Sequence, residues 1–165
     1  MESMLEVFGK ENLKCWTDNS LTNVKIPSSS KHFLESNGLP EGVDWTMTFD
    51  VSANRPLPYA NKNGFRVIGH DGDVEICLDE NRYGCVVALE GGRGVRFINS
   101  NVECFGSFLA LYQRYRKLVR GMDDDEAMEL IARTENEMRA IDKQAFSGKE
   151  YWWPVIIEQM RDGML

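Results

Sequence analysis

Three carboxylates at alternate positions are the first candidate for chemistry in this sequence. Asp71, Asp73 and Glu75 could hold a hard cation such as Ca²⁺, which takes several oxygen ligands from a short loop. An EF-hand loop that begins at Asp71 would need glycine at its sixth position and glutamate at its twelfth. The sequence has Ile76 and Arg82 there. The pattern therefore indicates a charged turn between two strands, and we expect no metal site.

A glycine-rich segment is the second candidate, because backbone N–H groups in such a loop can bind phosphate. Gly91, Gly92 and Gly94 lie close together, but no G-K-[ST] sequence follows them. The segment joins two expected strands instead of leading into a helix. Glycines with positive φ in a turn explain this pattern. We expect no cofactor to bind there.

Nucleophilic catalysis would need a serine or cysteine beside a histidine that a third group orients. The sequence has two histidines, His32 and His70, and no G-x-S-x-G or papain-like motif. Its cysteines form no C-x-x-C pair, which favours free thiols; they are Cys15, Cys77, Cys85 and Cys104. Carboxylates paired as in glycosidases stay open, because their pairing depends on three-dimensional geometry. We predict no catalytic residue and interpret the chain as a non-enzyme.

Two further groups of residues have both a structural and a functional interpretation. The first is a basic cluster of Arg114, Arg116, Lys117 and Arg120. These cations could contact nucleic acid, but we favour a structural role at a helix end, where they offset the dipole and pair with the acidic residues 123–126. The second is the pair Trp152 and Trp153. Such pairs often divide into one core ring and one partly exposed ring, which can act as a binding hot spot.

The charge of the chain is uneven. The net charge is −7, and residues 121–165 hold 11 acidic and 5 basic side chains, so most of the imbalance lies in the last quarter. Phosphate backbones repel such a surface, whereas basic surfaces attract it. We therefore expect a basic protein, and not nucleic acid, as the partner.

The apolar periodicity divides the chain into a helical beginning, a sheet and a helical end. Residues 1–44 have helix-like spacing, and residues 28–30 are the expected cap of a short helix that ends near Gly38 and Pro40. At residues 45–51 the period changes to two, as in a half-buried strand. Further strands are expected at residues 65–68, 74–78, 85–89 and 95–98. Their connections are too short for crossover helices, so the sequence predicts an antiparallel meander of five or six strands.

Three helices are expected after the sheet. Ser100 with Glu103, and Asp123 with Glu126, have the spacing of a capping box, and Ser147 with Glu150 is the expected cap of the last helix. The expected spans are residues 100–121, 123–146 and 147–163. The first helix carries a broad apolar stripe for the sheet. The acidic second helix has a thinner stripe, which consists of Met128, Ile131, Met138 and Ile141.

The length and composition suit one domain. With 165 residues, of which 42% are hydrophobic, the chain can bury a core without a metal or a disulfide. We expect a single domain at residues 1–165, with a core at about 28–120 and C-terminal helices at 123–163. Glu6 interrupts the apolar stretch near the start, so neither a signal peptide nor a membrane span is expected. The prediction is a cytoplasmic α+β protein.

Four segments in this order resemble the SUKH superfamily, and especially its fourth type, a group of bacterial immunity proteins. They are Phe33-Leu34 with Gly38-Leu39-Pro40; Ile68-Gly69, Asp71-Gly72, Ile76-Cys77-Leu78-Asp79 and Gly84-Cys85-Val86; Phe97-Ile98-Asn99-Ser100 with Phe105, Phe108 and Leu109; and Trp153 with Val155, Ile156 and Gly163. The resemblance spans about residues 28–165. The acidic helix at residues 123–145 departs from the pattern of the family.

The resemblance implies an α+β immunity protein, which binds and neutralises the effector domain of a polymorphic toxin, commonly a nuclease or a deaminase. It implies no catalytic residue. Two alternatives stay open: a non-enzymatic regulatory or scaffold protein of the same superfamily, and a small carboxylate-dependent hydrolase. The sequence leaves the oligomeric state open.

A nuclease domain must present cations to phosphate, so negative charge on its inhibitor would favour binding. We therefore predict that the acidic helix, the hairpin turns and one tryptophan contact the partner. The predicted contact residues are Asp71, Asp73, Glu80, Asp123, Asp124, Asp125, Glu126, Glu129 and Trp152.

Overall fold

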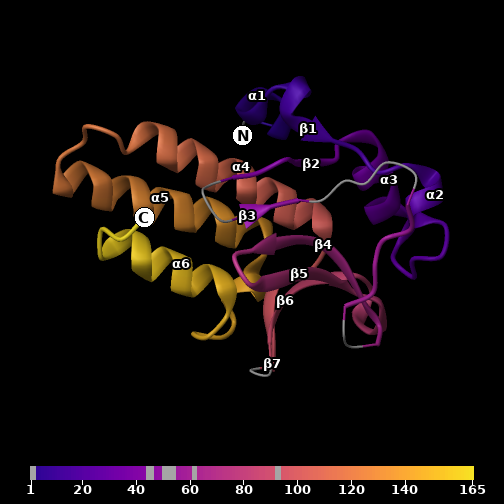
Figure 1. The fold of residues 1–165 in the computed structure, drawn as a ribbon. Helices are drawn as coiled ribbons and strands as arrows, with labels where there is room; N and C mark the ends of the chain where they lie inside the picture. The colour runs from indigo at the N-terminus through magenta and orange to yellow at the C-terminus, as the bar shows by residue number, and fades with distance from the viewer. Residues whose placement is uncertain (1–2, 44–46, 50–54, 61–62, 92–93) are drawn as a thin grey trace.

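Five strands form the antiparallel meander that the alternating sequence predicts. A computed structural model describes residues 3–43, 47–49, 55–60, 63–91 and 94–165. The strands lie side by side in chain order: β3 (Met47–Thr48), β4 (Phe65–Asp71), β5 (Val74–Asp79), β6 (Cys85–Glu90) and β7 (Gly94–Asn99). Helices precede and follow this sheet (Figure 1). The predicted α+β class is confirmed.

The start of the sheet differs from the expected strand at residues 45–51. The structure describes residues 47–49 of that stretch, and β3 covers Met47–Thr48; Trp45 and Val51 lie outside the described residues. A second, two-stranded sheet was not expected and pairs β1 (Leu13–Lys14) with β2 (Leu39–Pro40). Gly38 makes this close approach possible. Its φ is +68°, and a Cβ atom there would lie 2.0 Å from the carbonyl oxygen of Lys14.

Short helices build the N-terminal part: α1 (Met4–Phe8), η1 (Lys10–Asn12), α2 (Asp18–Leu21) and α3 (Ser28–Ser36). The expected cap at residues 28–30 is wrong. The helix already begins at Ser28, after Pro27, and no side chain caps it. Ser30 instead donates its Oγ–H to Glu103 Oε2 of α4 (Val102–Leu118) at 2.9 Å. The hydroxyl therefore joins two helices.

The C-terminal helices form a layer against the sheet (Figure 1). Besides α4 they are α5 (Asp124–Ile141), η3 (Lys143–Phe146) and α6 (Trp152–Arg161). Both α4 and α6 contact β7, and α4 also contacts β6. The acidic helix α5 packs mainly on α4 and α6. Predicted packing of C-terminal helices on the sheet is thus confirmed.

The caps of these helices differ in part from prediction. Asn101, and not Ser100, caps α4: its Oδ1 accepts the N–H of Cys104 at 2.8 Å. The predicted box of Asp123 with Glu126 is confirmed. The acidic helix ends at Ile141 and not at Phe146, and η3 covers the last residues of the expected span.

The last helix also begins later than expected. Its N-cap is Tyr151, without a side-chain hydrogen bond, so the expected cap of Ser147 with Glu150 is wrong. Pro154 lies in the first turn of α6, where its missing N–H costs no helical hydrogen bond. Gly163 follows the helix with a φ of +67°, as expected for a helix end.

A buried carboxylate joins the last strand to the helical layer. Asp142 is 5% exposed and directly follows α5. Its Oδ2 accepts the backbone N–H of Ser100 at 2.8 Å and Nδ2 of Asn99 at 3.0 Å, and its Oδ1 accepts Oγ of Ser100 at 2.8 Å. Oδ1 of Asn99 accepts Nε1 of Trp153 at 2.8 Å. We call these four residues the Asp142 network; it ties together the ends of β7 and α5 and the start of α6.

We predict that Asp142→Ala lowers the free energy of unfolding by about 3 kcal/mol, because donors of Asn99 and Ser100 lose their acceptor and each unsatisfied buried group costs about 1–3 kcal/mol. Urea denaturation followed by tryptophan fluorescence measures this change. The exposed Asp125→Ala is the matched control, with an expected change below about 0.5 kcal/mol. Equal losses in the two variants would contradict the role of the network.

Candidate partner-binding surface

The acidic residues predicted on α5 lie together at one end of the helical hairpin. Asp123, Asp124, Asp125, Glu126 and Glu129 are all exposed. Figure 1 shows the turn between α4 and α5 at the end of the hairpin that points away from the sheet. The structure thus brings five of the predicted contact residues onto one part of the surface.

Two of these five carboxylates have a structural task. Asp123 Oδ1 accepts the N–H of Glu126 at 2.9 Å, and Glu126 Oε2 accepts the N–H of Asp123 at 3.3 Å. Among the described residues, no ion pair involves Asp124, Asp125 or Glu129. Negative charge in the first turn is also stabilised by the dipole of α5. The helix therefore tolerates this concentration of charge and leaves three carboxylates available to a partner.

Apolar side chains lie beside these carboxylates. Leu118, Met122 and Met128 are among the exposed large hydrophobic residues, and Met128 is 47% exposed. The prediction that Met128 belongs to the buried stripe of α5 is wrong; Leu130, Ile131, Thr134 and Met138 form its buried face. We call the exposed set the α4–α5 end surface. It consists of Leu118, Met122, Asp124, Asp125, Met128 and Glu129.

The other predicted contact residues lie elsewhere. Asp71 ends β4 and is half-buried, and Asp73 is exposed in the turn between β4 and β5, apart from the end of the α4–α5 hairpin (Figure 1). The side chain of Glu80 is 6% exposed, and Trp152 is 5% exposed. The expected partly exposed ring is therefore wrong, because both tryptophans of the pair are buried. Contact through Asp71 and Asp73 stays a prediction.

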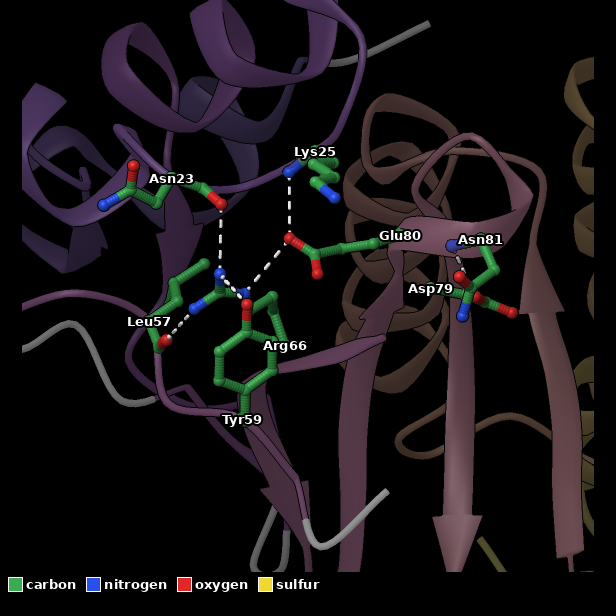
Figure 2. Close-up of polar contacts among 8 residues, drawn as sticks. All are labelled: Asn23, Lys25, Leu57, Tyr59, Arg66, Asp79, Glu80 and Asn81. Atoms are coloured by element: carbon green, nitrogen blue, oxygen red, sulfur yellow. Dashed lines mark hydrogen bonds and ion pairs between the residues drawn. The ribbon is translucent and has the colours of Figure 1, made fainter. Parts of the chain in front are cut away.

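Glu80 is buried because it pairs with a buried arginine (Figure 2). Glu80 Oε1 accepts Nε of Arg66 at 3.1 Å and the backbone N–H of Lys25 at 2.9 Å. Asp79 Oδ1 accepts the N–H of Asn81 at 3.0 Å and so fixes the turn η2 (Glu80–Arg82) that carries Glu80. The turn directs this carboxylate inward, whereas the sequence predicted an exposed residue on a hairpin.

The remaining donors of Arg66 are also satisfied (Figure 2). Its Nη1 donates to the carbonyl of Leu57 at 2.9 Å, and its Nη2 donates to the carbonyl of Asn23 at 3.0 Å and to the hydroxyl of Tyr59 at 2.6 Å. The guanidinium carbon lies 3.5 Å from the centroid of the Tyr59 ring. Arg66 thus joins β4 to the N-terminal part and to the loop before β4, and we interpret this cluster as structural.

The basic cluster at the end of α4 has structural partners as well. Arg114 Nη2 lies 2.6 Å from Glu137 Oε1 of α5. Arg116 and Lys117 donate to the carbonyls of Val43 and Val7, at 2.8 and 2.6 Å. The favoured structural role is therefore confirmed for these three cations. Their expected pairing with residues 123–126 is wrong.

The histidines and cysteines considered from the sequence come from several elements, and His32 Nδ1 lies 3.4 Å from Oγ of the exposed Ser36. His32 lies on α3 and His70 on β4, and among the described residues no group of three metal-binding side chains is close enough to hold an ion. Burial raises the pKa of the Cys77 thiol to about 12, with a smaller contribution from Glu75, and also raises the pKa of Cys85. Burial likewise raises the pKa of Cys104 to about 11. These thiols are poor nucleophiles, because the reactive form is the thiolate.

Sequence reasoning missed two structural features of this surface and its support. The burial of Asp142, which holds the end of α5, could not be recognised, because a single aspartate in an expected acidic helix resembles a solvent-exposed residue. The exposure of Met128 becomes clear only when the buried face of α5 is known. A helical phase fitted to Leu130, Thr134 and Met138 would have placed Met128 outside.

The fold and this surface define a class: an α+β protein with helices packed on an antiparallel meander and an exposed acidic helix end. Within that class, the chain belongs to the SUKH-4 immunity protein family, whose model matches residues 1–159. Membership confirms the resemblance seen in the four sequence segments and supports a role as an immunity protein. No curated protein and no solved structure matches the chain. Among the described helices, none has the length and apolar character needed to cross a membrane.

We predict that Arg66→Met lowers the free energy of unfolding by about 3–5 kcal/mol, because it leaves the Glu80 carboxylate buried and unpaired. Adding Glu80→Gln should restore part of this loss, since it removes the buried charge. Urea denaturation of the single and double variants gives the coupling between the two residues. Lys14→Met breaks the exposed pair with Glu41 and serves as the control, with an expected loss of at most about 1 kcal/mol.

Proposed function

We propose that this immunity protein neutralises the effector domain of a bacterial polymorphic toxin, a nuclease or a deaminase, by binding it through the α4–α5 end surface. One observation carries the proposal: exposed carboxylates without ion pairs among the described residues lie beside exposed apolar side chains on this surface. Such a surface suits a partner with basic groups around an apolar patch.

The charge supports a partner that binds nucleic acid. A nuclease, or a deaminase that acts on nucleic acid, presents cations where it holds the phosphate backbone. A carboxylate surface attracts the same cations, which raises the rate of encounter. Once bound, it would occupy the region where phosphate is held. Inhibition then needs no chemistry from the immunity protein.

The apolar residues supply the part of the affinity that salt does not screen. Leu118, Met122 and Met128 expose apolar area that a partner could cover. Methionine adapts its shape to the surface it meets, because its unbranched chain has three rotatable bonds. Burial of such residues at the centre of an interface typically accounts for much of its binding energy.

The surface is held in place before binding. Arg114 of α4 pairs with Glu137 of α5, and Glu135 of α5 pairs with both Arg139 and Arg161, the latter on α6. The Asp142 network fixes the other end of α5. A preorganised helix loses little conformational entropy on binding, which favours tight association.

A pull-down from the native host, with the tagged chain as bait, identifies the partner. Recovery of a toxin effector domain with a basic surface supports the proposal. Recovery of a cell-wall or other regulatory complex, with no toxin, would instead support the scaffold alternative.

We predict that Asp124→Lys, Asp125→Lys and Glu129→Lys together weaken toxin binding about 10- to 100-fold at low salt, since each exposed pair contributes about 0.2–1 kcal/mol and reversal replaces attraction with repulsion. The remaining affinity should depend less on salt. Isothermal titration calorimetry at several salt concentrations measures both effects. Asp123 and Glu126 stay unchanged, so the capping box is intact.

The matched control reverses three exposed acidic residues on other elements: Glu11, Asp18 and Glu150. It changes the net charge by the same amount, so an equal loss of affinity in both variants would indicate a general charge effect instead of this surface.

We predict that Met128→Ala weakens toxin binding about three- to tenfold and leaves its salt dependence unchanged, because it removes apolar contact area worth about 25 cal/mol per Å² but no charge. The same titrations measure it. Met164→Ala, at another strongly exposed methionine, is the control and should bind like the wild type. An unchanged affinity for Met128→Ala would remove the apolar residue from the interface.

A further inference from the structure

The sequence contains two asparagine–glycine pairs, Asn37-Gly38 and Asn63-Gly64. In such a pair the backbone nitrogen of the glycine can attack the side-chain amide carbon of the asparagine, because glycine has no side chain that obstructs the approach. We propose that Asn63 deamidates spontaneously in the folded protein and that its product loosens the buried cluster around Arg66. This inference goes beyond the proposed function and does not depend on it.

The reaction needs only water as a co-reactant. A bond forms between the nitrogen of Gly64 and Cγ of Asn63, the bond from Cγ to Nδ2 breaks, and ammonia leaves with the proton of the glycine N–H. Water then opens the resulting cyclic imide at one or the other carbonyl carbon. Opening at the former side-chain carbon gives aspartate, and opening at the backbone carbon gives isoaspartate, in which the main chain runs through the former side chain.

Both reacting groups of the second pair are free. Asn63 is exposed, and neither its side chain nor the N–H of Gly64 forms a hydrogen bond with a described residue. The pair lies in the loop that leads into β4, where the N–H of Ala60 donates to the carbonyl of Phe65 at 3.0 Å. Within the described part of the chain, no hydrogen bond of either reacting group has to break before the nitrogen of Gly64 attacks.

The first pair, by contrast, is blocked. The N–H of Gly38 donates to the carbonyl of Phe33 at 3.0 Å, and the N–H of Asn37 donates to the same carbonyl at 2.8 Å, so both nitrogens are held at the end of α3. Gly38 is also buried, and its backbone lies against the backbone of Lys14. The attacking nitrogen is therefore fixed at this site, which makes Asn37 the internal control for Asn63.

Gly64 connects the product to the cluster shown in Figure 2. The carbonyl of Gly64 accepts the N–H of Glu80 at 2.8 Å. A Cβ atom on Gly64 would overlap the side-chain amide of Asn81, so the loop packs directly on the turn η2. Isoaspartate lengthens the main chain immediately before Gly64 and displaces this contact. Glu80 then loses its fixed position beside Arg66, and a buried charge with poorer partners lowers the stability of the fold.

Incubation of the folded protein in mildly alkaline buffer, followed by digestion with pepsin at low pH and mass spectrometry, tests the proposal. Alkali speeds the attack because it removes the proton of the glycine nitrogen, and low pH stops the reaction during digestion. We expect Asn63 to deamidate at least about tenfold faster than Asn37, since the hydrogen bond and the packing of Gly38 must open first. Electron-based fragmentation distinguishes isoaspartate from aspartate at each site.

The same incubation in urea controls for the sequence around each pair. Both pairs should react at similar rates in the unfolded chain, because neither glycine nitrogen is held there. Equal rates at Asn37 and Asn63 in the folded protein would overturn the proposal. So would an Asn63 that stays intact in the folded protein while the unfolded chain reacts.

Urea denaturation of the incubated protein measures the effect on stability. We expect the fraction with isoaspartate at residue 63 to unfold at a lower urea concentration than the fresh protein. Asn63→Gln, whose longer side chain cyclises far more slowly, should keep its midpoint through the same incubation. Asn63→Asp has the new charge without the longer main chain and should unfold like the fresh protein. An unchanged midpoint in the isoaspartate fraction would overturn the link to Arg66, and neither result bears on toxin binding at the α4–α5 end surface.

Discussion

One buried carboxylate determines how the helical layer sits on the sheet. Asp142 accepts three hydrogen bonds from the end of β7, and Asn99 passes the connection to Trp153 of α6. Apolar packing alone would allow these elements several arrangements, because it has little directional preference. Hydrogen bonds to a buried charge favour a single arrangement of these elements, since any other arrangement leaves the charge without hydrogen-bond partners. The position of α5, and with it the proposed binding surface, depends on this selection.

The same principle recurs at β4. Arg66 and Glu80 are a buried ion pair whose remaining groups are satisfied by backbone atoms of the N-terminal part and of the loop before β4. Most of the well-partnered polar groups therefore serve the architecture. The carboxylates of Asp124, Asp125 and Glu129 differ, because they form no ion pair among the described residues and lie exposed at the α4–α5 end surface. Polar groups that have no partner within the protein are therefore the best candidates for binding another molecule.

The sequence predicted the sheet well because alternation and short polar turns are local signals. It also predicted the box of Asp123 with Glu126, whose two partners are three residues apart. It failed at Ser100 and Ser30, which were expected to cap helices locally, and at Glu80, which was expected on an exposed turn. All three use distant partners in the fold. The burial of Trp152 was missed for a related reason: two adjacent tryptophans can both be buried when the helix that carries them contacts more than one element, and α6 contacts both β7 and α5. Family resemblance added the role, which no local pattern of residues expresses.

The placement of α5 has a consequence for how such proteins diversify. This helix packs mainly on α4 and α6, and its outer residues, such as Asp125, Met128 and Glu129, are exposed. Substitutions there leave the interior packing unaltered and, under the proposed function, change mainly what the molecule recognises. A lineage that faces new toxins can therefore vary this exterior while the scaffold beneath keeps its stability, so recognition and folding evolve under separate constraints.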